Sequence, residues 1–487
     1  MAAATVGLTV AATLPAGLAA AATPHAAGPT IKLIVAQKKI DVPQFGKDRV
    51  FLDPGVYVAA LGAQLQFDVH RAGYAKPVTI TEVLNPSRGV VVVRTLPSKM
   101  VDGFKGLSRF IRLTVKNSHG KKVASEILPF CPNDGNPQRT GPDSPGNSPF
   151  PQQCQSDPFQ LGMIYGLQKD WATDPVGNGF FFSGQSVKLK LGRYKVSVDI
   201  MSAWRRLLHI SSADANATVR MHVIKQKSGC VFICLARRPH QPKMLPELPA
   251  AKTLNSPPKA DLPDLSPLPS WGIRVSNFAP KHKKATTQMS FGATVWVGGN
   301  SRLDVEGFRH DGSPWMHAYQ YFYRNGHVVG RTRVGTMGFS GYNHWHFQQF
   351  AQYRLLNSSK TKVLRSQKEG FCIAPTDPVN LLLPHATWVP SFTGLSGACS
   401  SQSALWVREE LPLGWGDTYF QDTPGQAFNV TNLPNGTYYI EIIANPEKLL
   451  HETNMRNDIS LRKVILGGTP GHRTVRVPAV HGIDSER

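Results

Sequence analysis

The sequence predicts an all-β protein, in which an N-terminal β-sandwich-like region precedes a second β-rich domain. The chain contains 43 glycines and 38 prolines in 487 residues. Turn formers at this frequency favour short strands over long helices. Apolar residues alternate along residues 187–200 on either side of Gly192, which is typical of two strands joined by a tight turn.

A short pattern, Leu-x-x-Gly-x-Tyr, supports the same fold class. It occurs at residues 52–57, 189–194 and 433–438. In many β-sandwiches a tyrosine that directly follows a tight turn packs beneath that turn. The three occurrences therefore predict two or three sandwich-like modules.

Residues 1–28 resemble a secretory signal peptide. The first 23 residues carry no charge, are rich in alanine, valine and leucine, and end in small residues, as signal peptides do. A transmembrane anchor is the weaker alternative, because Pro15 and two glycines interrupt the stretch. We therefore expect a secreted, extracellular protein.

Changes in composition divide the remaining chain. Residues 29–130 are predicted to form a β-sandwich-like domain, and residues 131–235 a second module with a cysteine-closed loop or a continuation of the first. Nine prolines in residues 236–270 predict an extended linker. A β-rich domain at 271–468 and a tail at 469–487 complete the predicted order.

Six cysteines fit an oxidising compartment, where disulfides persist. Sequential pairing is the simplest of about fifteen connectivities, and it joins Cys131 to Cys154, Cys230 to Cys234 and Cys372 to Cys399. The close spacing of Cys230 and Cys234 also suits a redox or metal site, and the local disulfide is the favoured alternative.

The formal net charge is +22. Basic residues exceed acidic residues by 15 in residues 1–270 and by 7 in residues 271–487. Such an excess attracts polyanions, so an anionic cell-surface polymer is a candidate partner of the N-terminal half. The sequence contains no nucleic-acid-binding motif, and we expect no nucleic acid as a partner.

One segment is typical of a metal site. His344 and His346 are two residues apart, and on a strand their side chains would share one face with Tyr342. Neutral imidazole is a ligand of copper, zinc, nickel and iron. On spacing alone, two histidines on a solvated polar face remain the favoured alternative.

Several further motifs follow one another in order. They are Leu262-Pro-Asp-Leu265, Val305-Glu-Gly-Phe308, the histidine segment, Lys368-Glu-Gly-Phe-Cys372, Gly416-Asp-Thr-Tyr419, Asn435-Gly-Thr-Tyr438 and Asn445-Pro446 with Glu452 to Asn457. Over about residues 262–468 the chain thereby resembles the lysyl oxidase family, and its secreted bacterial members most of all. The resemblance implies a β-rich, lysyl-oxidase-like catalytic domain.

The resemblance also implies copper and lysyl tyrosylquinone, a cofactor made from a lysine and a tyrosine of the chain. The family lysine falls on Lys368 and the family tyrosine on Tyr419. The implied reaction uses dioxygen to convert a primary amine, peptidyl lysine or a small amine, to an aldehyde, with release of hydrogen peroxide and ammonia. Asp417 is the candidate base if the stretch before Tyr419 is extended.

The chain departs from the family pattern of three alternating histidines, because Tyr342 occupies the first position. An ordinary phenol has a pKa near 10, so tyrosine is a poorer metal ligand at neutral pH. A distant histidine is the other candidate ligand, and the sequence does not choose among His310, His317, His327, His385 and His451. A Cys372–Cys399 disulfide would fasten the segment that holds Lys368.

Three hypotheses follow from the sequence. The first is a secreted copper- and quinone-dependent amine oxidase. The second is a catalytically degenerate β-sandwich protein that binds cell-surface polymers, and the third is a secreted metal-binding protein without a quinone. Lys368 and Tyr419 discriminate among them, because an oxidase of this type needs both residues.

Overall fold

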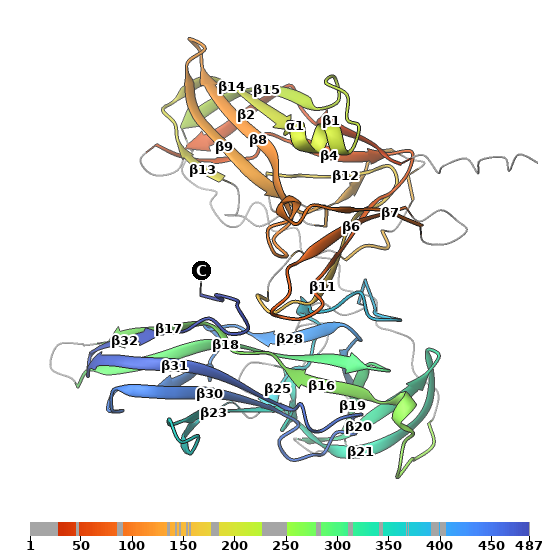
Figure 1. Cartoon of the computed structure of the whole chain (residues 1–487), viewed down its shortest axis with the longest axis vertical. Helices are drawn as coiled ribbons and strands as arrows, with labels where there is room; N and C mark the ends of the chain where they lie inside the picture. Colours follow the sequence, from red (N-terminus) through yellow and green to blue (C-terminus); the bar gives the residue numbers. More distant parts are fainter. Residues whose placement is uncertain are drawn as a thin grey trace, which may run out of the picture.

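The computed structural model confirms the all-β prediction (Figure 1). It describes residues 28–486 apart from the gaps 45–47, 85–90, 134–136, 142–143, 146–147, 152–153, 155–156, 177–184, 226–250, 279–283, 310–314, 340–343, 367, 369, 391–398 and 400–405. The α-helical structure in the described residues is the short α1 (Ser202–Leu207), with 3-10 turns η1 (Ser98–Met100) and η2 (Lys259–Asp261). Among these residues, no helix has the length and apolar character needed to span a membrane.

The N-terminal part, residues 28–225, folds into several antiparallel sheets with one parallel pair. The strands of the first sheet are, in spatial order, β1 (Thr30–Val35), β4 (Val56–Leu61), β12 (Trp171–Thr173) and β10 (Gln138–Arg139), and those of the second are β11 (Gly162–Leu167), β5 (Leu65–His70), β6 (Thr79–Leu84) and β7 (Val91–Leu96). The third sheet pairs β13 (Gln185–Lys188) with β3 (Arg49–Leu52). The fourth contains β2 (Lys39–Gln44), β15 (Asn216–Lys225), β14 (Gly192–Ile200), β8 (Leu107–Asn117) and β9 (Lys122–Phe130).

Strands from residues 29–130 and from residues 131–235 share these sheets. For example, β14 lies between β8 and β15, and β12 pairs with β4. In the described residues the two segments therefore contribute strands to the same sheets. The predicted disulfide Cys131–Cys154 is confirmed, whereas Cys230, Cys234 and residues 1–27 lie outside the described residues.

The predicted alternation along residues 187–200 is present in β14. Val196, Val198 and Ile200 are buried, while Arg193 and Lys195 are exposed. The tyrosines of the turn pattern also behave alike at two sites. The hydroxyl of Tyr194 donates a hydrogen bond to the Lys190 carbonyl at 2.9 Å, and the hydroxyl of Tyr438 donates one to the Pro434 carbonyl at 2.8 Å. Each tyrosine thus ties the start of a strand to its preceding turn.

The C-terminal part, residues 251–486, contains three further sheets in its described residues. The first sheet contains, in spatial order, β16 (Pro263–Pro267), β18 (Thr286–Gly299), β28 (Trp415–Tyr419) and β26 (Asp377–Pro378), and β17 (Trp271–Phe278) and β29 (Ala427–Asn429) also pair with β18. The second contains β25 (Gly370–Phe371), β22 (Trp345–Gln348), β21 (His327–Phe339), β20 (Trp315–Arg324), β19 (Leu303–Arg309) and β27 (Trp406–Leu411). The third contains β24 (Lys362–Arg365), β23 (Ala351–Leu356), β30 (Gly436–Ala444), β31 (Ile459–Thr469) and β32 (His472–Arg476).

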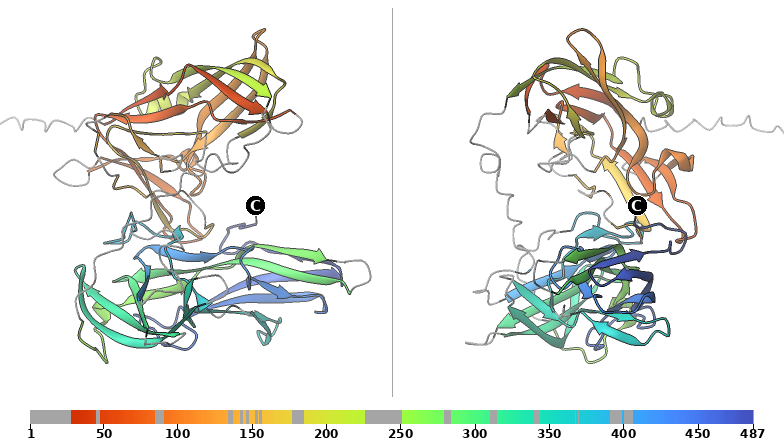
Figure 2. Two further views of the ribbon diagram at one scale, coloured as in Figure 1. Left: turned by 180° about the vertical axis from the view of Figure 1, so that it is seen from behind. Right: turned by 90° about the vertical axis from the view of Figure 1, so that its left-hand side faces the viewer.

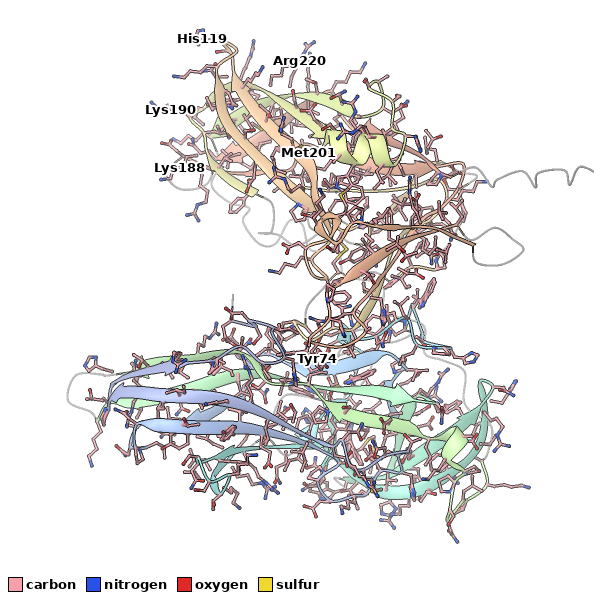
Figure 3. The ribbon with its side chains drawn as sticks, in the orientation of Figure 1. Tyr74, His119, Lys188, Lys190, Met201 and Arg220 are labelled. Atoms are coloured by element: carbon pink, nitrogen blue, oxygen red, sulfur yellow. A yellow bond between two sulfur atoms is a disulfide. The ribbon has the colours of Figure 1, made fainter. Side chains whose placement is uncertain are left out.

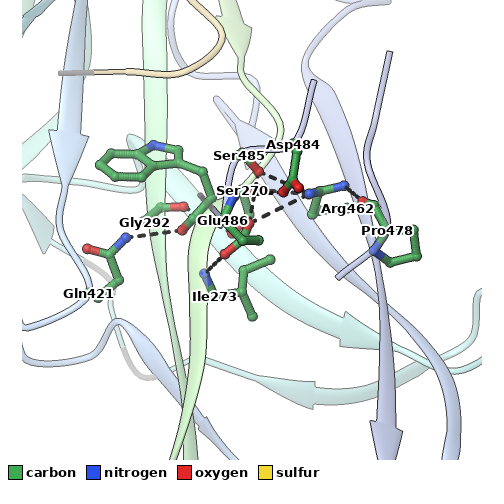
Figure 4. Close-up of polar contacts among 10 residues, drawn as sticks. Ser270, Ile273, Gly292, Gln421, Arg462, Pro478, Asp484, Ser485 and Glu486 are labelled. Carbon is green, nitrogen blue, oxygen red and sulfur yellow. Dashed lines mark hydrogen bonds and ion pairs between the residues drawn. The ribbon is translucent and has the colours of Figure 1, made fainter. Parts of the chain in front are cut away.

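Both ends of this part differ from the sequence prediction. Of the predicted linker, residues 236–250 lie outside the described residues, and Pro263–Pro267 form β16, which pairs with β18. Prolines are tolerated at such a sheet edge. The predicted tail contains β32, and the segment after it is held by Arg462, whose guanidinium donates to Pro478 at 2.5 Å and to Ser485 at 3.0 Å (Figure 4). A segment whose composition is typical of a tail is therefore held against the domain by hydrogen bonds from a buried arginine.

The two parts lie one above the other along the long axis, and the region around β11 joins them (Figures 1 and 2). The N–H groups of Leu161 and Gly162 donate to the carbonyl of Val379 at 2.7 and 3.0 Å. Tyr74, labelled at this junction in Figure 3, stacks on His481 with ring centroids 5.1 Å apart. Main-chain bonds and ring packing therefore connect the N-terminal part to the sheet that contains β26 and β28.

A buried carboxylate of the N-terminal part reaches this sheet. Asp157 accepts hydrogen bonds from the hydroxyl of Thr294 and the N–H of Phe159, both at 2.7 Å. The Thr294 hydroxyl also lies 2.7 Å from the hydroxyl of Thr418 on β28. Burial raises the pKa of Asp157 to about 7, the Thr294 hydrogen bond opposes the shift, and the nearby charge of Asp377 adds to it.

This raised pKa predicts a pH-dependent stability. The carboxyl binds its proton more tightly when folded than when unfolded, so its contribution is full below about pH 4 and is lost as pH rises through about 7. Relative to Asp157→Asn, the wild-type free energy of unfolding should fall by up to about 1.4 kcal/mol per pH unit in that window. Urea denaturation at several pH values measures this, with the exposed Asp102→Asn as control. An identical slope in wild type and Asp157→Asn would contradict the assignment.

Candidate active site

Strand β28 places two of the predicted site residues on one face. All five of its residues are buried, and it pairs with β18 on one side and β26 on the other. Because side chains two apart on a strand share a face, Asp417 and Tyr419 point the same way. The extended conformation on which the nomination of Asp417 depended is therefore present, while its role as a base stays a prediction.

The phenol of Tyr419 is fixed by the main chain of Cys372. Its oxygen accepts a hydrogen bond from the Cys372 N–H at 2.8 Å and lies 3.2 Å from the Cys372 carbonyl, to which it donates. The ring of Phe371 meets the Tyr419 ring edge-on, with centroids 5.1 Å apart. These contacts hold the position and the plane of the tyrosine ring.

Lys368 lies against this ring. Its Nζ atom is 4.2 Å from the centroid of Tyr419 and 5.3 Å from that of Phe371. Lys368 is 7% exposed and Tyr419 is 8% exposed, so the amine meets the aromatic ring almost without water. The structure thus brings together the two residues that the family resemblance singled out, 51 positions apart in the chain.

Two small residues hold the lysine backbone in place. The Ser366 hydroxyl accepts a hydrogen bond from the Lys368 N–H at 3.0 Å and donates to the Gly425 carbonyl at 2.7 Å. Gly425 has a φ of +89°, and a Cβ added there would lie 3.2 Å from the Lys368 Cβ. Only glycine combines this backbone conformation with this close approach.

Burial sets the protonation of the site. It lowers the pKa of Lys368 to about 8, a shift that the Asp417 charge opposes. Burial raises the pKa of Asp417 well above its usual range, the Lys368 ammonium opposes this, and Asp377 adds to it. The phenol of Tyr419 also has a pKa raised well above its usual range, first by burial and then by the charges of Asp417, Tyr353 and Glu409.

Glu409 is a buried carboxyl that sequence reasoning missed. It lies on β27, is fully buried, and accepts the Ile373 N–H at 3.1 Å. Burial raises its pKa well above the usual range, and the main-chain donors of Ile373 and Phe347 oppose the shift. The signal in the sequence is a glutamate pair inside the otherwise strand-like run Trp406–Leu411.

The two histidines adjoin this cluster through strand pairing. His346 lies on β22, and the next two residues of that strand, Phe347 and Gln348, pair with Phe371 and Gly370 of β25. The rings of His344 and His346 are 4.4 Å apart. His346 is buried, and burial, followed by the nearby charges of His344 and Lys368, lowers its pKa to about 3.

Neutral imidazole is a ligand of metals such as copper, and the low pKa of His346 keeps that side chain neutral. Tyr342 and His310 lie outside the described residues, and within the described residues no cluster of three or more histidine, cysteine or acidic side chains could hold a metal. The structure therefore brings His344 and His346 together. Among the described residues, none of His317, His327, His385 and His451 forms a three-residue metal cluster with them.

The disulfide between Cys372 and Cys399 is confirmed. It links the phenol anchor to the histidine strand, because the Cys399 carbonyl accepts the Trp345 N–H at 2.9 Å. One covalent bond thus connects the segments that position Tyr419 and His346.

The site defines an all-β domain with a buried lysine–tyrosine pair beside two adjacent histidines. Residues 338–471 match the family model for lysyl oxidase. A stretch of 119 residues, 24% of the chain, is 25% identical to lysyl oxidase homolog 2 of Bos taurus, and it covers 13% of that protein. The chain thus resembles the lysyl oxidase family over this segment. The motifs at 262–265 and 305–308 precede the part that the family model matches.

The contact between Gly425 and Lys368 leads to a stability prediction. Gly425→Ala should lose about 1 kcal/mol of unfolding free energy from backbone strain and about 1 kcal/mol more because Lys368 must shift. Gly326→Ala is a matched control, since Gly326 has a φ of +80° and nothing within 4 Å of an added Cβ. Urea denaturation of both variants measures the difference, and equal losses would show that the Lys368 contact has no energetic consequence.

Proposed function

We propose that this protein is a secreted, copper-dependent amine oxidase of lysyl oxidase type, whose cofactor is lysyl tyrosylquinone formed from Lys368 and Tyr419. The observation that carries the proposal is the 4.2 Å between the Lys368 Nζ atom and the Tyr419 ring centroid in a buried site. The net reaction converts a primary amine, dioxygen and water to an aldehyde, ammonia and hydrogen peroxide. Peptidyl lysine and small primary amines are the proposed substrates.

The lowered pKa of Lys368 supports its role as a cofactor precursor. An amine is a nucleophile only when it is neutral. With a pKa of about 8, about one Lys368 side chain in ten is neutral at pH 7, compared with about one in three thousand for an ordinary lysine. The clamp formed by Ser366 and Gly425 keeps this amine over the ring.

His344 and His346 are the proposed copper ligands, with Tyr342 at the first position of the family pattern. Imidazole binds metal in its neutral form, and the low pKa of His346 favours that form of His346. Copper held by these histidines would supply the chemistry with dioxygen that converts the Lys368–Tyr419 pair to the cofactor, and the quinone would supply an electrophilic centre and an electron sink for a primary amine.

Asp417 is the proposed proton acceptor. It shares a strand face with Tyr419, and the Lys368 ammonium and the main-chain N–H of Ala374 both favour its charged form. Burial raises its pKa, which makes its carboxylate a stronger proton acceptor than that of an ordinary aspartate. If Lys368 gives up its charge on joining the ring, the pKa of Asp417 rises further, because that charge opposes the shift.

The two disulfides of the described residues, Cys131–Cys154 and Cys372–Cys399, support secretion. Disulfides persist in oxidising compartments and are rare in the cytosol of most organisms. Cys372–Cys399 also ties together the site itself.

Amine-dependent hydrogen peroxide release tests the proposed function. The purified chain, loaded with copper in air, should release peroxide with butylamine or a lysine-containing peptide. Lys368→Arg and Tyr419→Phe should each reduce the rate by at least about 100-fold, because neither variant can form the cofactor. Lys362→Arg, an exposed lysine on β24, should keep the wild-type rate. A Lys368→Arg variant with full activity would refute the proposal.

A further inference from the structure

The outer face of the sheet β2-β15-β14-β8-β9 carries an unusual arrangement of charge. On β15, Val219 and Met221 are buried while Arg220 is exposed. On β14, Val196 is buried while Lys195 is exposed. One face of the sheet therefore packs on the core, and the other presents basic side chains to solvent.

The strand register aligns these side chains in a single row. Lys39 pairs with Arg220, Arg220 with Lys195, and Lys195 with Lys116. Since adjacent strands are about 4.8 Å apart, these four cations, here called the basic row, span about 14 Å across the sheet. Lys122 on β9 pairs with Lys116 and extends the row by one strand.

The basic row has no acidic partner in the described part of the chain. None of its four side chains forms an ion pair there, and the nearby carboxylate of Asp41 lies 3.5 Å from His222. Like charges directly opposite each other destabilise a sheet. The row therefore carries a repulsion that a bound polyanion would relieve.

The row also lines a hollow of about 770 Å³ that includes Arg193 and His222. Figure 3 labels Arg220 near the end of the N-terminal part that is farthest from the C-terminal part. The hollow is thus remote from Lys368 and Tyr419, and a long polymer could lie in it without covering them.

We propose that the basic row binds a linear anionic polysaccharide of the cell surface. Its evenly spaced cations match a chain that carries sulfate, phosphate or carboxylate groups at regular intervals, and the outward side chains leave room for such a chain to cross the strands. The proposal rests on the register of this sheet and is independent of amine oxidase activity.

The hollow favours a sugar polymer over a nucleic acid. Single-stranded nucleic acids bind through aromatic side chains on which bases stack, in addition to cations. The one phenol lining the hollow, Tyr194, is half-buried, and its hydroxyl donates to the Lys190 carbonyl. The outward side chains of the row are cations without an exposed aromatic ring among them.

Binding of a fluorescent heparin oligosaccharide to the full chain tests this inference. At 0.15 M salt the double variant Lys195→Glu/Arg220→Glu should weaken binding at least about tenfold, because two opposed cations become anions. The slope of log affinity against log salt should also become shallower, since fewer ion contacts form. Thermal melting should remain near that of wild type, because both side chains are exposed.

The matched control is Lys463→Glu/Arg476→Glu. It makes the same change in net charge at exposed strand positions of the C-terminal part, and it should change the affinity less than twofold. An equal loss in both double variants would mean that net charge alone attracts the probe. Absence of wild-type binding, or equally tight binding of a thymidine oligonucleotide of matched charge, would also overturn the proposal.

Discussion

The hydrogen bonds between the Tyr419 phenol and the main chain of Cys372 are the constraint on which the candidate site depends. They fix a ring whose other neighbours, Phe371 and Lys368, come from the same segment as Cys372. The Cys372–Cys399 disulfide then ties this segment to the loop whose carbonyl receives the Trp345 N–H. Three pieces of chain that are far apart in sequence are thus held in one arrangement by one phenol and one covalent bond.

The site is buried enough to change the chemistry of its residues. Water around Lys368 would keep it a cation, and water around Asp417 would keep it an anion. Burial instead lowers the pKa of Lys368 and raises the pKa of Asp417, so it favours the uncharged form of each. The charge of each residue opposes the shift of the other. The N-terminal part contributes to the same sheet, because Asp157 accepts a hydrogen bond from Thr294, which contacts Thr418 on β28.

Local patterns predicted the fold class and two disulfides, because strand alternation and loop closure are short-range properties. The proximity of Lys368 and Tyr419 followed from the family resemblance and not from spacing, since no local rule joins Lys368, which lies between β24 and β25, to Tyr419 on β28. Sequence reasoning missed Glu409 and Gly425, whose roles arise only when strands pack. It also predicted a tail where Arg462 supplies buried hydrogen bonds, since composition alone does not reveal a tertiary anchor.

Mass spectrometry of the copper-loaded, air-exposed protein tests the central claim most directly. After proteolysis without prior reduction, the account predicts that the peptides containing Lys368 and Tyr419 are covalently joined, and that the joined species is absent from Lys368→Arg. Separate, unmodified peptides from a protein that has bound copper would contradict the account, because the amine and the ring would then lie together without forming the cofactor.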